Sequence, residues 1–64
     1  MNNLKEIRIK NNVTQEEIAE HIGINKSIIS RYERGIKDIS LSLAIDIADY
    51  FKCTLDELVN RKER

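Results

Sequence analysis

The stretch from 15 to 34, QEEIAEHIGINKSIISRYER, constrains the fold more than any other part of this 64-residue chain. In its first half Ile18, Ala19 and Ile22 recur at the three- and four-residue spacing of one buried helical face. Gly23 follows where a helix must stop, because a residue without a Cβ atom easily adopts the positive φ that reverses the chain. A second amphipathic segment begins almost at once. The spacing therefore predicts two helices joined by a tight turn.

The second segment of this pair is cationic and hydroxylic on its outer side. Ile29 and Tyr32 predict its inner face, and Asn25 is suited to cap its N-terminus. The outer face would carry long cations and short hydroxyls, namely Lys26, Ser27, Ser30, Arg31 and Arg34. A surface of this kind suits a DNA groove, although many solvated helix exteriors are equally basic.

The remaining apolar pattern predicts three further helices and an all-α fold in one domain. No segment alternates with the period of two that is typical of strands. Capping boxes, in which a Thr and a Glu three residues later cap each other's backbone, are expected at Thr14 and Thr54. The helices are predicted over residues 4–11, 15–22, 26–34, 41–51 and 55–61. The fourth should turn inward a stripe made of Leu41, Ala44, Ile45, Ala48 and Phe51.

The net charge of the chain is zero, but basic and acidic residues are concentrated in different segments. There are 11 basic and 11 acidic residues, so the net charge is zero. Residues 24–37 hold four cations and one acid, whereas residues 38–57 hold five acids and one cation. A docked phosphate senses charges within about 8 Å at physiological salt, so the local basic patch matters more than the total. Zero net charge predicts weak nonspecific binding to nucleic acid.

Nothing in the sequence predicts catalysis, a metal site or a cofactor. His21 stands without Cys or carboxylate at ligand spacing and is expected to be solvated. Cys53 is the single cysteine, so no disulfide is available, and it is interpreted as a small core residue. There is no long apolar run and no leader pattern, which predicts a cytoplasmic protein without a membrane segment.

Taken together, these residues resemble the helix-turn-helix domain of Cro and the phage repressors over nearly the whole chain. The matching elements, in order, are Arg8, Thr14-Gln15, Ala19, Gly23, Ser27, Ser30 and Glu33-Arg34-Gly35. One position departs from the family. Its usual proline before the fourth helix is Ile39 here, which predicts a less rigid loop around Lys37.

The resemblance implies that the segment from 26 to 34 enters the major groove of double-stranded DNA. The residues expected to reach base edges are Lys26, Ser27, Ser30 and Arg31, with Arg31 best suited to guanine. Gln15 and Arg34 are expected at phosphates by similarity, and Asn25 and Lys37 by chain position. For Asn25, a pure N-cap is an equal alternative. Arg8 and Glu33 are expected to pair and hold the reading helix in place.

The resemblance also leads to an expected function and assembly. The chain is interpreted as a transcriptional regulator, a repressor that binds a palindromic operator as a homodimer. Four aliphatic residues left over after the core is assigned should be exposed, namely Ile28, Ile36, Leu43 and Val59. Leu43 and Val59 are predicted to form the dimer interface. The alternative is a protein-interaction module, such as an antitoxin, in which the same fold binds an unknown protein partner.

Overall fold

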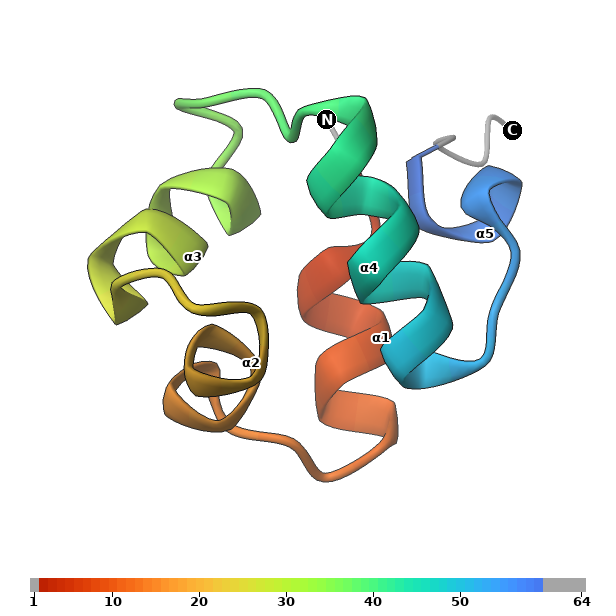
Figure 1. Ribbon diagram of the computed structural model, residues 1–64, viewed down its shortest axis with the longest axis horizontal. Coiled ribbons are helices and arrows are strands. Elements are labelled where there is room, and N and C mark those ends of the chain that lie inside the picture. The colour runs from red at the N-terminus through yellow and green to blue at the C-terminus, as the bar shows by residue number, and fades with distance from the viewer. Residues whose placement is uncertain (1, 60–64) are drawn as a thin grey trace.

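The computed structural model describes residues 2–59, and in that part of the chain it contains five α-helices and no strand (Figure 1). The predicted all-α fold is confirmed. The helices are α1 (Leu4–Lys10), α2 (Gln15–Ile22), α3 (Lys26–Glu33), α4 (Leu41–Phe51) and α5 (Leu55–Val59). The first and third end one residue earlier than expected, and positions 60 and 61 of the expected fifth helix lie outside the described residues. No helix between residues 2 and 59 is both long and apolar enough to cross a membrane.

The boundaries of α2 have clear local causes. The Glu17 N–H donates to Thr14 Oγ1 at 3.0 Å, and the Thr14 N–H donates back to Glu17 Oε1 at 2.8 Å. This capping box confirms the predicted start of the helix. At the other end Gly23 adopts a φ of +78° and its N–H donates to the Ala19 carbonyl at 2.8 Å. Because a positive φ strains residues that have a Cβ atom, glycine is the favoured residue at this turn.

The beginning of α3 differs in one respect from the expectation. Asn25 occupies the N-cap position with an extended backbone, but its side chain makes no capping hydrogen bond. The interpretation of Asn25 as a side-chain cap is therefore wrong. Its amide is exposed beside the turn between α2 and α3.

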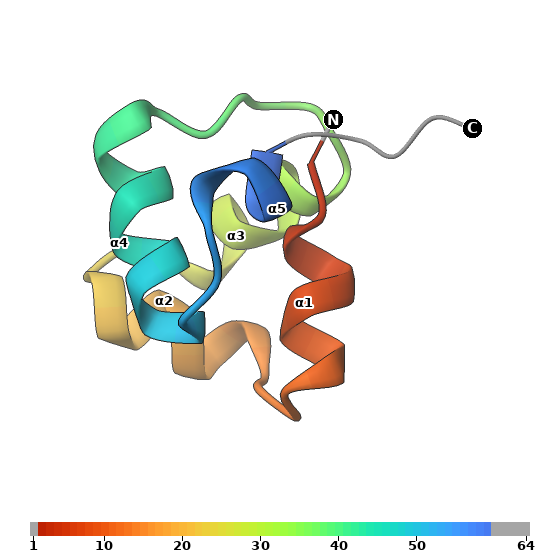
Figure 2. The same ribbon diagram turned by 90° about the vertical axis from the view of Figure 1, so that its right-hand side faces the viewer.

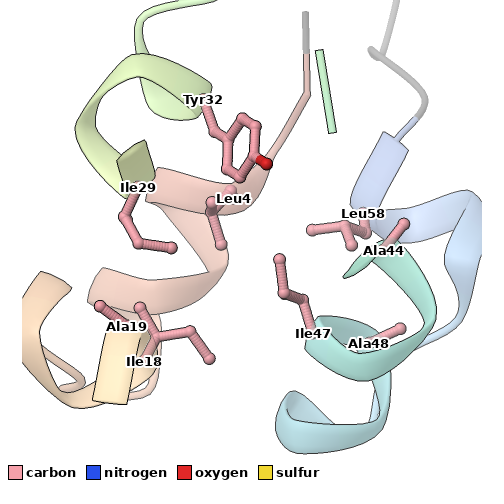
Figure 3. Packing of buried hydrophobic residues seen from close by; sticks show 9 residues of the cluster. All are labelled: Leu4, Ile18, Ala19, Ile29, Tyr32, Ala44, Ile47, Ala48 and Leu58. Carbon is pink, nitrogen blue, oxygen red and sulfur yellow. The ribbon is translucent and has the colours of Figure 1, made fainter. Parts of the chain in front are cut away.

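The five helices share one apolar core, seen in close-up in Figure 3. Five side chains in it are completely inaccessible, one from each helix: Leu4, Ile18, Ile29, Ile47 and Leu58. Ala19, Ala44 and Ala48 are small residues in the same core, and Tyr32 is 4% exposed. Burial of a side chain from each helix in one cluster fixes α2 and α3 against the rest of the domain.

The orientation of α4 corrects two sequence predictions. Leu41 and Ile45 were expected inside, but they are 69% and 43% exposed, whereas Ile47 is completely buried. Leu43 was expected to be exposed and is instead partly buried against the core, as is Ile28 on α3. The segment LSLAIDIADYF is apolar on most of its circumference, so its period alone does not fix the inward face. Packing against α2 and α5 decides it.

The N-terminal segment is attached to the end of the last helix. The Asn3 N–H donates to the Leu58 carbonyl at 2.8 Å, and Asn3 Nδ2 donates to the Glu57 carbonyl at the same distance. Asn2 Oδ1 accepts the Leu4 N–H at 2.9 Å, so the side chain of Asn2 caps the start of α1. The start of the chain therefore lies beside α5 (Figure 2).

Candidate nucleic-acid interface

The outer face of α3 is the main cationic surface of the helical pair formed with α2. Lys26, Ser27, Arg31 and Arg34 are exposed, and Ser30 is half-buried. Ser27 and Arg31 are four residues apart, so they lie in one row along the helix. None of the large apolar side chains that are exposed between residues 2 and 59 belongs to α3. The face can therefore offer charge and hydrogen bonds to a partner, but little apolar area.

An ion pair fixes the C-terminal end of α3 to α1. Arg8 Nε lies 2.6 Å from Glu33 Oε2, and Arg8 Nη2 donates to Glu33 Oε1 at 3.2 Å, which makes the contact bidentate. The two side chains are only 12% and 4% exposed. Arg8 Nη1 also donates to the Val13 carbonyl at 2.9 Å. One guanidinium thus joins the loop before α2 to the last residue of α3, and its planar fork restricts their relative orientation.

Gln15 is part of the same cluster, which the sequence did not indicate. Its Nε2 donates to Glu33 Oε1 at 3.0 Å. This side chain was expected at a phosphate, and in the structure it is half-buried with one N–H engaged internally. The amide has a second N–H, so the internal bond leaves one donor over. No spacing rule links residues 15 and 33, because the bond depends on how α2 and α3 cross.

A shallow groove of about 560 Å³ opens beside this cluster, between the end of α1 and the N-termini of α2 and α3. Arg8, Thr14, Gln15, Glu16 and Lys26 contribute to its walls. Lys26 Nζ lies 3.9 Å from Glu16 Oε2, and the two side chains are 57% and 78% exposed. Glu16 thus places an acid among the cations expected to face DNA, and no sequence pattern had linked it to Lys26.

Two of the other expected phosphate contacts, Arg34 and Lys37, lie at the opposite end of α3. Arg34 is the C-cap residue, is exposed, and donates from Nε to the Ser30 carbonyl at 3.4 Å. Lys37 is exposed in the loop that follows. The Lys37 N–H donates to the Arg31 carbonyl at 3.4 Å, which ties the start of the loop to α3. Asn25 and Lys37 therefore mark the two ends of the α3 surface.

The two residues expected at a dimer interface differ in exposure. Val59 on α5 is 39% exposed, but Leu43 is partly buried against the core. The exposed aliphatic residues of α4 are instead Leu41 and Ile45, one turn apart on one side of the helix.

His21 and Cys53 have side chains of types that could serve in catalysis or metal binding. His21 is exposed, and its ring centroid lies 4.4 Å from that of Tyr50. Cys53 is half-buried, and burial together with the nearby charge of Glu57 raises the pKa of its thiol above the ordinary value of 9.0. Among residues 2–59 no three His, Cys, Asp or Glu side chains are grouped closely enough to hold a metal ion.

Comparison with known proteins assigns this arrangement to a family. The sequence profile named helix-turn-helix matches residues 4–58. An uncharacterised HTH-type transcriptional regulator of Methanocaldococcus jannaschii is 37% identical over 57 residues, which cover 89% of this chain and 86% of that protein. AnsR, an HTH-type transcriptional regulator of Bacillus subtilis, is 36% identical over all 64 residues, and this chain spans 55% of its length. The CTXphi repressor RstR of Vibrio cholerae is 28% identical over 60 residues, 94% of this chain and 54% of RstR.

A solved structure shows the same fold. The crystal structure of a candidate DNA-binding protein from Bacteroides fragilis matches with a TM-score of 0.89 and 23% identity, covering 94% of this chain and 97% of the other. The likeness concerns the arrangement of the helices. The profile match over residues 4–58 and the 37% identical relative lead to one conclusion: the chain belongs to the helix-turn-helix family of the Cro and phage-repressor type.

Proposed function

We propose that this protein is a sequence-specific, double-stranded DNA-binding transcriptional regulator acting in the cytoplasm. The observation that carries the proposal is the exposed cationic face of α3, held at its C-terminal end by the buried carboxylate of Glu33. A helix presented in this way can enter the major groove with its side chains in a fixed direction. The relatives described as HTH-type transcriptional regulators support the same function.

Base reading falls to the outer face of α3. Arg31 offers a bidentate guanidinium that matches the two acceptors of guanine in the major groove. Ser27 lies in the same row and can donate or accept a hydrogen bond, so it discriminates less. Ser30 is half-buried and contributes at the edge of this surface.

Contacts with the phosphate backbone of DNA hold α3 in register from both ends of the helix. Gln15 has one N–H left for a phosphate after its bond to Glu33, and the exposed amide of Asn25 is close to the same end of α3. Arg34 and Lys37 supply cations at the other end. This division places the amide donors of Gln15 and Asn25 at the start of the reading helix and the cations of Arg34 and Lys37 at its end.

The active form in this proposal is a homodimer that represses transcription by occupying a palindromic operator. One 64-residue domain offers a single short reading surface, and a two-fold pair reads two half-sites about one helical turn apart. The dimer surface includes Val59, with the exposed Leu41 and Ile45 in place of the partly buried Leu43.

A protein-interaction module is the second candidate function. Leu41 and Ile45 favour it, because two exposed aliphatic side chains one turn apart suit an apolar partner surface. Such a partner would take the place of the second copy on α4 and leave α3 to DNA, so partner binding and DNA binding can coexist, as in an antitoxin.

The deciding experiment is selection of bound duplexes from a random DNA pool at about 150 mM salt, where nonspecific binding is weak. We expect the wild type to enrich a palindrome and Arg31→Ala to lose preference at one symmetric base pair, a loss of about 1 to 3 kcal/mol. Absence of enrichment at every protein concentration would contradict DNA reading. A monomer mass independent of concentration, with and without DNA, would contradict the homodimer.

A further inference from the structure

Lys26 is the one member of the expected reading set that has a partner on another helix. Its ammonium lies 3.9 Å from the Glu16 carboxylate, which belongs to the first turn of α2. Both side chains contribute to the groove that also includes Thr14 and Gln15. The charged end of Lys26 is therefore on the α2 side of α3.

Helix geometry explains this direction. Side chains in an α-helix point back towards the N-terminus, over the turn that precedes their own Cα atom. Lys26 is the first residue of α3, so that preceding turn is the connection to α2. Ser27 lies about 100° around the helix axis from Lys26, and Arg31 lies one turn beyond Ser27 in the same row. Lys26 therefore belongs to a different row from the two residues proposed to read bases.

We propose that Lys26 binds the DNA backbone, beside Gln15 at the start of α2, and that Glu16 keeps it away from base edges. This inference rests on the proposed DNA-binding function. An ammonium group has three N–H donors, so it can approach Glu16 with one and a phosphate oxygen with another. The exposed pair is weak, but a weak tether is sufficient because it only has to select one of several directions for a flexible side chain. Glu16 thereby determines which of the α3 cations read sequence.

The first test compares Lys26→Met with Lys5→Met, an equal loss of charge on the exposed start of α1. We expect Lys26→Met to weaken binding by the same factor for the selected operator and for unrelated DNA. The slope of log affinity against log salt should become shallower by about one. The selected sequence should stay that of the wild type, and Lys5→Met should change neither quantity. Relaxed preference at one base pair in Lys26→Met, as expected for Arg31→Ala, would overturn the proposal.

The second test removes the tether and keeps the shape. In Glu16→Gln the carboxylate is replaced by a neutral amide, so we expect Lys26 to reach a base edge and add a guanine preference at one symmetric position. The double variant Glu16→Gln with Lys26→Met should lack that added preference. An unchanged selected sequence in Glu16→Gln would show that Glu16 does not direct Lys26. Thermal melting of each variant checks folding. If the wild type enriches no sequence, the proposed function fails, while the salt slope on unrelated DNA still decides whether Lys26 contacts the backbone.

Discussion

Helices α3 and α4 lie on the same core but differ in both their inner attachment and their outer face. α3 inserts Ile29 and Tyr32 and is further held by the bidentate contact of Glu33 with Arg8. α4 inserts Ala44, Ile47 and Ala48, and its start is capped by Ser40 Oγ, which accepts the Leu43 N–H at 3.3 Å. Outside, α3 presents cations and hydroxyls, whereas α4 presents Leu41 and Ile45.

The difference shows how a small domain can serve two kinds of contact. Apolar packing is not directional, so it can hold α4 in place without fixing the positions of its outer atoms closely. The hydrogen bonds of the Arg8 and Glu33 pair are directional, and they act on the helix that is proposed to enter a DNA groove. Directional contacts are thus found behind the surface that needs precise placement.

The largest expected effect tests the attachment of α4. Ile47→Ala should lower the free energy of unfolding by about 3 to 4 kcal/mol, because it removes a completely buried side chain and leaves a cavity. Ile45→Ala, two residues away on the exposed side, should change it by less than about 0.5 kcal/mol. Urea denaturation of both variants measures the difference. Equal losses would mean that the two faces of α4 are assigned incorrectly.

A smaller loss is expected from the polar attachment of α3. Arg8→Met should cost about 2 to 3 kcal/mol, less than for a fully buried pair, because Arg8 retains some exposure. The nearly inaccessible carboxylate of Glu33 would keep the Gln15 hydrogen bond but lose its cation. Lys10→Met removes an exposed cation from the same helix and serves as the control. A loss no greater than that of Lys10→Met would contradict a structural role for the pair.

The smallest effect concerns the half-buried thiol that follows α4. The folded state raises the pKa of Cys53, so above about pH 9 the unfolded state binds fewer protons than the folded state. The contribution of this thiol to stability is complete below that pH and falls as the pH rises through 9 towards the folded pKa. We expect wild type to lose stability between about pH 8 and about pH 10 more steeply than Cys53→Ala, measured by urea denaturation at each pH. Parallel profiles would show that the thiol is not shielded.

The elements that sequence analysis located correctly are those fixed by neighbours in the chain. Thr14 and Glu17 are three residues apart, and Gly23 stops α2 by its own backbone freedom. These are local interactions, so their residue types identify them. The long-range pair of Arg8 and Glu33 was predicted from the family pattern and not from spacing. A family resemblance indicates which helices contact each other.

The elements that it missed depend on packing between segments far apart in the sequence. Leu41, Ile45 and Ile47 are all apolar, and only the position of α4 against α2 and α5 decides which of them is buried. The hydrogen bond of Gln15 to Glu33 and the approach of Lys26 to Glu16 need the crossing of α2 and α3. The residue types at the candidate site were therefore predictable from the sequence. The contacts that these residues make with one another were not.

The attachment of Asn3 to α5 has a consequence for the order of folding. Its side-chain bond to the Glu57 carbonyl joins residues 54 positions apart, so closing it requires almost the whole chain. A five-residue helix is too short to persist by itself, and α5 is therefore stabilised by its hydrogen bonds with Asn3. Separation of Asn3 from α5 would expose hydrogen-bonding groups on both segments. During synthesis, Asn3 obtains these partners only when residues 57 and 58 have been released.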